Sequence, residues 1–214
     1  MMRLAVSQRV EEFPERNERR DALDQRLVQW LASAGALSYP VPNAWSDGND
    51  GQPLSAWLIA LEPTGIVLSG GEDLHASPAR DATERALLRY AQAHRLPVLG
   101  LCRGMQMLAA FSGGILVKIP GHAGSRHALD TAEGSELPSA VNSFHAWGLL
   151  ECPAGYEILA RAADGSIEAI RHSTLPWEGW MWHPEREPTF AESGLVRLQS
   201  LLFDPGSGGG RRVG

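Results

Sequence analysis

A cysteine at the junction of a short apolar strand and a helix carries the strongest chemical signal in the sequence. Residues 97–101 read Pro-Val-Leu-Gly-Leu, Cys102 follows, and apolar residues recur at helical spacing over 105–111. Gly100 and Gly104 stand two residues before and two after the cysteine, which is the spacing of a nucleophile elbow with cysteine in place of serine. Such a turn exposes its central side chain at a helix N-terminus, whose positive end favours a thiolate. The pattern therefore predicts a nucleophilic thiol in preference to a buried structural cysteine.

A thiol nucleophile needs a base, and the base needs a group that orients it. The aromatic and apolar run 177–182 is typical of a buried strand, and it ends at His183-Pro184-Glu185. Because proline cannot continue a strand ladder, the chain is expected to leave the sheet there. The Glu185 carboxylate can then turn back onto the imidazole of His183. His145 is the competing base in the sequence.

Strands and helices alternate through the first half of the chain, which predicts an α/β fold with a mostly parallel central sheet flanked by helices. The expected strands are 3–7, 37–41, 65–68, 97–101 and 115–119, the expected helices are 18–34, 54–61 and 77–94, and 43–52 reads as a loop. Parallel strands bring their carboxyl ends to one edge of a sheet, where ligands bind. Ser7, Ser69, Cys102 and His183 each follow a predicted strand, so they are expected together at that edge.

The second half of the chain predicts a small antiparallel extension. Residues 120–150 are polar with scattered glycines, and 156–161 and 167–171 read as a hairpin around Asp164-Gly165. A closing helix is expected over 194–203.

Length and composition limit the possible functions. The 214 residues are 43% hydrophobic and carry a net charge of −6, which suits one compact domain and argues against nucleic acid as a partner. No apolar run approaches the ~20 residues of a membrane span, and the N-terminus lacks the apolar run of a signal peptide. We expect a single domain over 1–205, a disordered Gly-rich tail over 206–214, and a cytoplasmic location.

The cysteines and histidines predict neither a disulfide framework nor a metal site. Cys102 and Cys152 are the two cysteines of the chain, too few for a disulfide scaffold. His122 and His127, taken with Cys152, match no common zinc-ligand spacing. No metal or other cofactor is therefore expected.

The ordered set of motifs resembles the class I glutamine amidotransferases. The resemblance runs from about residue 3 to residue 203, and it is closer to the stand-alone γ-glutamyl hydrolases, which are peptidase C26-like, than to synthetase-linked subunits. Besides Cys102 and His183-Pro184-Glu185, the matching segments are Ile66-Val67-Leu68-Ser69-Gly70-Gly71, Gln106, Asn142-Ser143-Phe144-His145 and the hairpin over 163–170.

The resemblance implies a role for each matching residue. The implied catalytic triad is Cys102, His183 and Glu185, acting through a γ-glutamyl thioester. The implied oxyanion hole consists of backbone N–H groups of Gly70, Gly71 and Arg103. The implied substrate-binding residues are Gln106, Asn142, Ser143, Phe144 and His145. Nothing in the sequence decides whether His145 is catalytic or shapes the pocket.

The N-terminal third resembles one branch in particular. Residues 6–10, 18–25 and 40–43 look like those of the γ-glutamyl-CDP-amidate hydrolases of bacterial surface-polysaccharide pathways, which implies release of glutamate and cytidine diphosphoramidate. Arg9 follows the first strand and is the expected phosphate ligand. Other arginines and three tryptophans are further candidates for phosphate binding and base stacking, namely Arg19, Arg20, Arg103, Arg126, Trp45, Trp147 and Trp177.

Three alternatives remain at the level of the sequence. A γ-glutamyl-γ-aminobutyrate hydrolase would use the same triad on a carboxylate-bearing leaving group. A glutaminase subunit of a two-protein amidotransferase would need a synthase partner. A binding or regulatory protein would have lost the reactivity of Cys102.

Overall fold

A central eight-stranded sheet organises the protein, and the structure, a computed structural model, describes residues 2–45, 52–132 and 135–203. In order across the sheet, the strands are β4 (Ala36–Pro40), β1 (Met2–Val6), β5 (Gly65–Leu68), β6 (Val98–Leu101), β14 (Trp177–Trp180), β13 (Ile167–His172), β12 (Tyr156–Arg161) and β9 (Asp130–Thr131). Neighbours from β4 to β14 pair in parallel, and those from β14 to β9 pair antiparallel. The predicted mostly parallel sheet with an antiparallel extension is confirmed.

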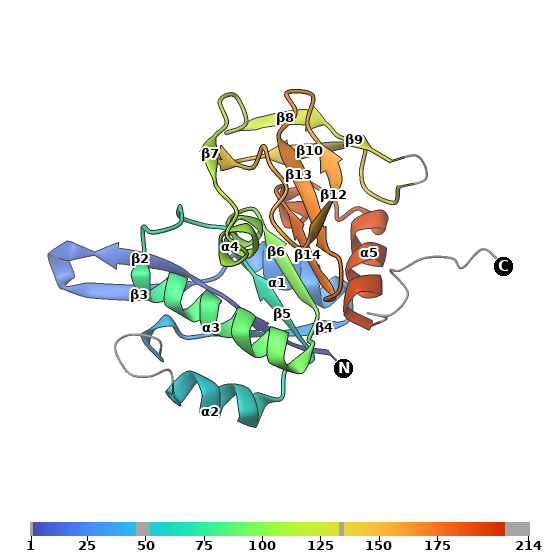
Figure 1. The fold of residues 1–214 in the computed structure, drawn as a ribbon. Helices are drawn as coiled ribbons and strands as arrows, with labels where there is room; N and C mark the ends of the chain where they lie inside the picture. Colours follow the sequence, from blue (N-terminus) through green and yellow to red (C-terminus); the bar gives the residue numbers. More distant parts are fainter. Residues whose placement is uncertain (1, 46–51, 133–134, 204–214) are drawn as a thin grey trace.

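Helices cover both faces of the sheet (Figure 1). The helices are α1 (Gln25–Ser33) and α5 (Glu192–Phe203) on one face, and α2 (Gln52–Leu61), α3 (Pro78–His94) and α4 (Arg103–Phe111) on the other. Side chains alternate along each strand, so Leu4 and Val6 join the core beneath α1 and α5, whereas Ala5 joins the core beneath α2, α3 and α4. Apolar side chains are therefore needed on both faces of the strands.

The predicted helix after Ser77-Pro78 is confirmed, together with its boundaries. The Ser77 side chain accepts a hydrogen bond from the backbone N–H of Arg80, and Pro78 occupies the first turn, as expected of a helix start. Arg95 ends the helix in a left-handed conformation with φ of 52°.

The predicted helix over 18–34 is wrong in its first third. Residues Glu18–Ala22 form strand β3, which pairs antiparallel with β2 (Arg9–Phe13), around a short 3-10 turn at Pro14–Arg16. Opposite charges face each other across this hairpin, with Glu11 beside Arg20, which favours a strand pair. The Asp24 side chain then caps α1 by accepting from the Arg26 N–H. Figure 1 shows the hairpin projecting from the body of the molecule.

Two small antiparallel pairs occupy the polar region, as predicted for 120–150. They are β8 (Ser125–Ala128) with β10 (Ala140–Ser143), and β7 (Val117–Lys118) with β11 (Trp147–Gly148). The strand predicted at 115–119 is limited to β7. Elsewhere Asn43–Trp45 forms a 3-10 turn within the predicted loop, and 46–51 and the tail 206–214 lie outside the described residues.

The hairpin predicted around Asp164-Gly165 is confirmed as β12 and β13. Gly165 adopts φ of +88°, a left-handed conformation that glycine allows at no steric cost. Within the described ranges, no helix is long and apolar enough to cross a membrane.

Candidate active site

Cys102 stands at a sharp turn between β6 and α4. Its backbone has φ of 49° and ψ of −103°, which side-chain-bearing residues rarely adopt, and such strain is often retained at functional sites. Hydrogen bonds hold the turn in place, because the Cys102 N–H donates to the Trp180 carbonyl at 2.7 Å and the Cys102 carbonyl accepts from the Gln106 N–H at 3.1 Å. The structure thus contains the strand–turn–helix that the sequence predicts.

The two glycines that flank Cys102 allow the elbow to pack tightly. A Cβ atom added at Gly100 would lie 2.6 Å from the carbonyl carbon and oxygen of Gly104, and one added at Gly104 would lie 2.1 Å from the carbonyl oxygen of Leu68. Both distances are far below van der Waals contact with backbone atoms, which cannot move aside. Any larger residue would push the N-terminus of α4 away from β5 and β6.

His183 and Glu185 form a buried pair after β14. The His183 Nδ1 atom lies 2.6 Å from Glu185 Oε1, and the two side chains are only 2% and 3% exposed. The 3-10 turn Pro184–Arg186 brings the carboxylate back to the ring. Asn142 fixes the backbone of His183 from the other side, donating to its carbonyl at 2.7 Å and accepting from its N–H at 3.0 Å.

The surroundings of His183 favour its protonated form. Burial by itself would lower the pKa of His183, but hydrogen bonds to Cys102 and Glu185, together with the charges of those groups, raise the pKa to about 9. An imidazolium next to a sulfur is the arrangement that stabilises a thiolate. The raised pKa keeps His183 protonated at neutral pH, next to the sulfur of Cys102.

The segment Ser69-Gly70-Gly71 lies against His183. A Cβ atom at Gly70 would be 2.4 Å from His183 Cε1, so only glycine leaves room for the ring. The Arg80 guanidinium donates to the carbonyls of Ser69 and Gly70 at 2.7 and 3.0 Å. Since these peptides are trans, the N–H groups of Gly70 and Gly71 point away from Arg80. The N–H of Arg103, at the first position of α4, has no partner within the helix.

A buried charge network behind the elbow was missed by the sequence analysis. The Glu84 carboxylate, which is fully buried, accepts from Arg80 at 2.9 Å, from Ser7 Oγ at 2.8 Å, and from the Arg103 guanidinium. Arg103 also donates to Asp81 at 2.5 Å. Arg80 and Glu84 stand four residues apart on α3, and this spacing was the only sequence signal of the pair.

The network explains the charge state of Glu84. Burial would raise the pKa of this carboxyl, but Arg80 and Arg103 and the hydrogen bond from Ser7 hold the pKa below its usual value. The Ser7 hydroxyl also accepts from the Ser69 N–H at 2.9 Å. These hydrogen bonds hold the start of α4 against the carboxyl ends of β1 and β5, beside Cys102.

The predicted substrate-binding residues have mixed environments. Gln106 is buried, and its side-chain amide donates to the Trp147 carbonyl at 2.9 Å. Asn142 holds His183 as described, Ser143 is fully buried, and His145 faces other buried polar side chains. Phe144 is 47% exposed and packs edge-on against the His183 ring with the ring centroids 5.8 Å apart.

A cavity of about 200 Å³ opens beside the His183–Glu185 pair. Arg9 lines it together with Gly70 and Gly71, and the Arg9 side chain is 49% exposed, with one weak contact to Glu11 at 3.7 Å.

The other candidates for phosphate binding and base stacking are engaged elsewhere. The Arg103 side chain is buried in ion pairs and Trp177 is buried in the core, so the expectation that these two could bind phosphate or stack a base is wrong. Arg20 and Arg126 are paired with Glu18 and Glu187, and Trp45 packs on Trp57.

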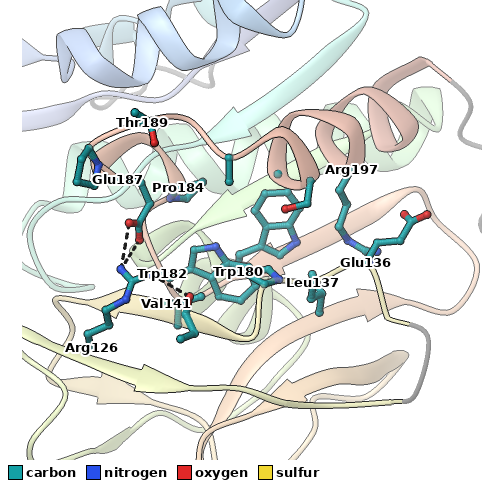
Figure 2. A pocket seen from close by; sticks show the side chains of 16 residues that line it. Arg126, Glu136, Leu137, Val141, Trp180, Trp182, Pro184, Glu187, Thr189 and Arg197 are labelled. Atoms are coloured by element: carbon teal, nitrogen blue, oxygen red, sulfur yellow. Dashed lines mark hydrogen bonds and ion pairs between the residues drawn. The ribbon is translucent and has the colours of Figure 1, made fainter.

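A second cavity, of about 260 Å³, lies on the other side of the 3-10 turn (Figure 2). Trp180 and Trp182 stack in its wall with ring centroids 5.6 Å apart, and the Arg126–Glu187 ion pair lies at one end. Neither Cys102, His183 nor Glu185 lines this cavity. It is therefore separate from the candidate active site.

Comparisons with known proteins place the chain in a family. The peptidase C26 family matches residues 4–185. A γ-glutamyl-CDP-amidate hydrolase from Campylobacter jejuni subsp. jejuni serotype O:2 is 31% identical over 142 residues, or 64% of this chain and 66% of that protein, just under two thirds of its length. A glutamine-hydrolysing GMP synthase subunit from Thermococcus kodakarensis is 30% identical over 169 residues, or 75% of this chain and 82% of that protein.

The fold also has a match among solved structures. A crystal structure from Thermoplasma acidophilum, described as that of a GMP synthase subunit, superposes with a TM-score of 0.70 and 22% sequence identity. The match covers 94% of this chain and 92% of that one, so the two proteins share the whole architecture.

Proposed function

Because this chain belongs to the peptidase C26 family, we propose that it is a cysteine-dependent hydrolase that releases glutamate from a γ-glutamyl amide. The observation that carries the proposal is the His183–Glu185 pair, with 2.6 Å between its polar atoms, beside a strained Cys102 elbow. The proposal assigns Cys102 as nucleophile, His183 as acid and base, and Glu185 as the group that orients His183. A free thiol needs a reducing compartment, so the reaction is placed in the cytoplasm.

The first half of the proposed reaction forms a thioester. The Cys102 thiolate attacks the γ-carbonyl carbon, and the oxygen becomes an oxyanion that backbone N–H groups of Arg103 and of Gly70 or Gly71 stabilise. Protonated His183 gives its proton to the leaving nitrogen as the C–N bond breaks. The amine departs, and a γ-glutamyl thioester remains on Cys102.

The second half releases glutamate. Neutral His183 takes a proton from water, and the water oxygen attacks the thioester carbonyl. The C–S bond then breaks, glutamate leaves, and the thiolate–imidazolium pair is restored. Gln106 and the segment Asn142-Ser143-Phe144-His145 are proposed to bind the amino acid end of the substrate, with no cofactor taking part.

For the leaving group, we propose cytidine diphosphoramidate, released from γ-glutamyl-CDP-amidate for surface-polysaccharide modification. Two observations support this choice. One relative carries this activity in its name and is 31% identical. Arg9 lines the cavity beside His183, and among the described residues its one ion-pair contact is weak, so its guanidinium is available for a diphosphate.

A second candidate is the glutaminase subunit of a two-protein amidotransferase. The relatives from GMP synthases favour it, because one of them aligns with 75% of this chain. Such a glutaminase would need a synthase partner to use the ammonia it makes, and its substrate would be glutamine itself. A γ-glutamyl-γ-aminobutyrate hydrolase remains the alternative with the same triad.

The test is glutamate release from γ-glutamyl-CDP-amidate, γ-glutamyl-aminobutyrate and glutamine by the wild-type protein, with Cys102→Ala as the blank. We expect a strong preference for the nucleotide substrate. Replacing Arg9 by alanine should raise KM for that substrate by about 10-fold to 100-fold, the loss of one charged hydrogen bond, and spare glutamine. Arg16→Ala, in the turn of the same hairpin and 62% exposed, is the matched control.

Each outcome decides between the candidates. Preference for glutamine, with turnover that rises when a synthase is added, would replace the proposed substrate by the glutaminase alternative. An equal loss on both substrates in Arg9→Ala would remove Arg9 as a phosphate ligand. Glutamate release by Cys102→Ala would overturn the proposed chemistry as a whole.

A further inference from the structure

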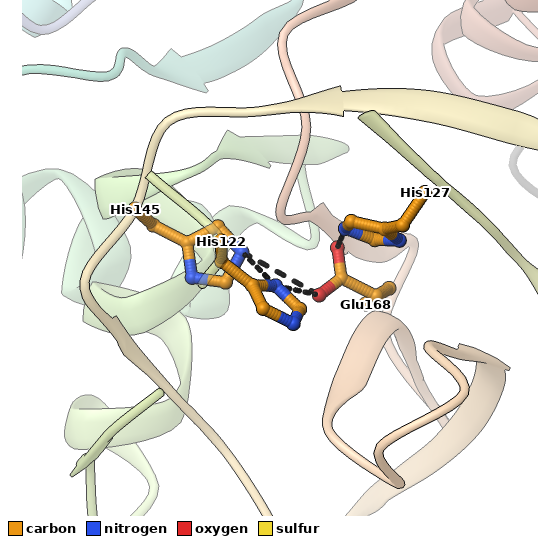
Figure 3. Close-up of side chains that lie close together, drawn as sticks. All are labelled: His122, His127, His145 and Glu168. Atoms are coloured by element: carbon orange, nitrogen blue, oxygen red, sulfur yellow. Dashed lines mark hydrogen bonds and ion pairs between the residues drawn. The ribbon is translucent and has the colours of Figure 1, made fainter. Parts of the chain in front are cut away.

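Three histidines and a glutamate from distant segments of the chain lie close together (Figure 3). His122 lies in the loop between β7 and β8, His127 lies on β8, His145 follows β10, and Glu168 lies on β13. Their ligand atoms all lie within 4.8 Å of one another. His122, His145 and Glu168 are buried, and the His127 side chain is 18% exposed. We call these four residues the histidine–glutamate cluster.

The spacing within the cluster is that of metal ligands. His122 Nδ1 lies 3.2 Å from His145 Nε2. Glu168 Oε1 lies 3.3 Å from His122 Nδ1 and 3.4 Å from His145 Nε2. The other oxygen, Glu168 Oε2, lies 3.8 Å from His127 Nε2. Tetrahedral bonds of about 2.0–2.1 Å to a zinc ion place neighbouring ligand atoms about 3.3–3.4 Å apart. The ligand atoms of His122, His145 and Glu168 match this spacing, and His127 Nε2 lies slightly farther out, at 3.8 Å from Glu168 Oε2.

The outer nitrogens of the three rings determine which atoms face inward. His145 Nδ1 lies 3.0 Å from the Trp147 carbonyl, and His127 Nδ1 lies 3.2 Å from the Ala128 carbonyl. A carbonyl only accepts, so both Nδ1 atoms carry the proton, and the Nε2 atoms of the neutral rings present lone pairs to the centre. His122 Nε2 faces the Asp164 carboxylate at 3.1 Å, which likewise leaves the lone pair of Nδ1 pointing inward.

Within the described ranges, neither oxygen of the Glu168 carboxylate has a hydrogen-bond partner, although its side chain is completely buried. His127 Nε2 also lacks one. Among the described residues, the ion-pair contacts of this carboxylate are with the three histidines alone. A buried carboxylate without hydrogen bonds that faces imidazole lone pairs is strongly unfavourable, and a cation at the centre would remove that cost.

We propose that His122, His127, His145 and Glu168 bind one divalent transition-metal ion, for which Zn²⁺ is the best match. Imidazole nitrogen and carboxylate oxygen are both zinc ligands, and four protein ligands complete a tetrahedral, structural site. Asp164 and the carbonyls of Trp147 and Ala128 supply the outer hydrogen bonds that orient metal-binding histidines. The sequence analysis weighed Cys152 as a companion of His122 and His127, but Cys152 is exposed and is not part of the cluster.

The site has a consequence for the active site. The Trp147 carbonyl accepts from His145 Nδ1 at 3.0 Å and also from Gln106 Nε2 at 2.9 Å. Gln106 lies on α4, one turn beyond Cys102. The ion would therefore fix the segment that joins β10 to β11 against strand β13. Through the Trp147 carbonyl, it would also hold the side chain of Gln106 in place.

The test is the metal content of protein purified without a metal-affinity step, measured by inductively coupled plasma mass spectrometry. We expect about one zinc per chain, also in a Cys102→Ala background, where the nucleophile cannot be the ligand. His127→Gln and Glu168→Gln should lose at least about nine tenths of the metal, since each removes one of four ligands. His94→Gln, an exposed histidine outside the cluster, should retain it.

A second measurement keeps the test decisive if a variant folds poorly. Chelator-treated wild-type protein should melt about 10 °C lower than the zinc-loaded form, and added Co²⁺ should give the intense visible absorption of a tetrahedral site. Trace metal in the purified protein, with no Zn²⁺ or Co²⁺ binding by the chelator-treated form and no change in Tm, would overturn the proposal. None of these readouts depends on hydrolase activity.

Discussion

At the residue scale, the imidazole of His183 is held between two partners that control its protonation. Cys102 and Glu185 raise its pKa to about 9 even though burial lowers it. The pKa of His183 is therefore higher in the folded state than in the unfolded state, where it is near 6.5. Protonation of His183 stabilises the folded state fully below pH 6.5, and this stabilisation is lost as the pH rises towards 9. In the proposed mechanism, His183 could no longer protonate the leaving nitrogen above that pH.

The first prediction is the alkaline limb of the pH–rate profile. For wild-type protein, kcat/KM should fall near pH 9, where His183 loses its proton. Glu185→Gln removes a charge that raises this pKa, so the limb should move to lower pH and the maximal rate should fall. Glu192→Gln, at an exposed position on α5, is the control. An unchanged limb in Glu185→Gln would mean that Glu185 does not act through His183.

Several residues of the candidate site were predictable because their signals are local. Cys102 with its two glycines, and His183 with Glu185, each fall within a few consecutive positions, so spacing alone indicated the chemistry. Arg80 and Glu84 carry no such signal, since a charged pair on a helix normally faces solvent. Their burial follows from the packing of α3 beside β5 and α4, which one sequence does not reveal.

At the element scale, the elbow depends on glycine at two positions. Gly104→Ala should abolish activity and lower the free energy of unfolding, because the new Cβ would lie 2.1 Å from the Leu68 carbonyl oxygen. Gly194→Ala on α5, where no atom lies within 4 Å of the added Cβ, should instead stabilise the protein by about 0.5–1 kcal/mol. Urea denaturation and initial rates would measure both. Full activity in Gly104→Ala would contradict the tight packing of the elbow.

The segment 18–34 shows why one element was predicted wrongly. Ala22 and Leu23 extend the apolar periodicity of the following helix backward, so the pattern favoured one long helix. Asp24 was the competing signal, since its side chain caps α1. Residues 18–22 pair instead with β2, whose sequence Arg-Val-Glu-Glu-Phe has no regular apolar alternation to recognise.

At the scale of the whole molecule, Glu84 joins three elements at the edge of the sheet. It contacts Ser7 after β1, Arg80 on α3, and Arg103 on α4. Its pKa is lowered mainly by the two arginines acting against burial. Its contribution to stability is therefore present above the ordinary carboxyl pKa and is lost as the pH falls through the lowered value.

Glu84→Gln should destabilise the protein by about 3–5 kcal/mol, because it leaves two buried guanidinium groups without their shared carboxylate. Glu157→Gln removes one partner of an exposed pair with Arg171 and should cost at most about 1 kcal/mol. Chemical denaturation at neutral pH would measure both changes. A loss in Glu84→Gln no larger than in the control would show that the network contributes little.

The arrangement of the whole sheet was predictable in outline only. Alternating strands and helices indicated parallel strands with their carboxyl ends at one edge, and Ser7, Ser69, Cys102 and His183 do meet there. The histidine–glutamate cluster was not predictable, because its members come from separate loops and strands and only the antiparallel extension brings them together.

In the proposed mechanism, Cys102 forms a γ-glutamyl thioester during turnover. Intact-protein mass spectrometry after a rapid acid quench, during turnover of a γ-glutamyl amide, would detect this intermediate. We expect a mass increase of one γ-glutamyl group, mapped to Cys102 by peptide analysis and absent in Cys102→Ala. A wild-type protein that turns the substrate over without any adduct at Cys102, or a Cys102→Ala protein that still releases glutamate, would contradict it.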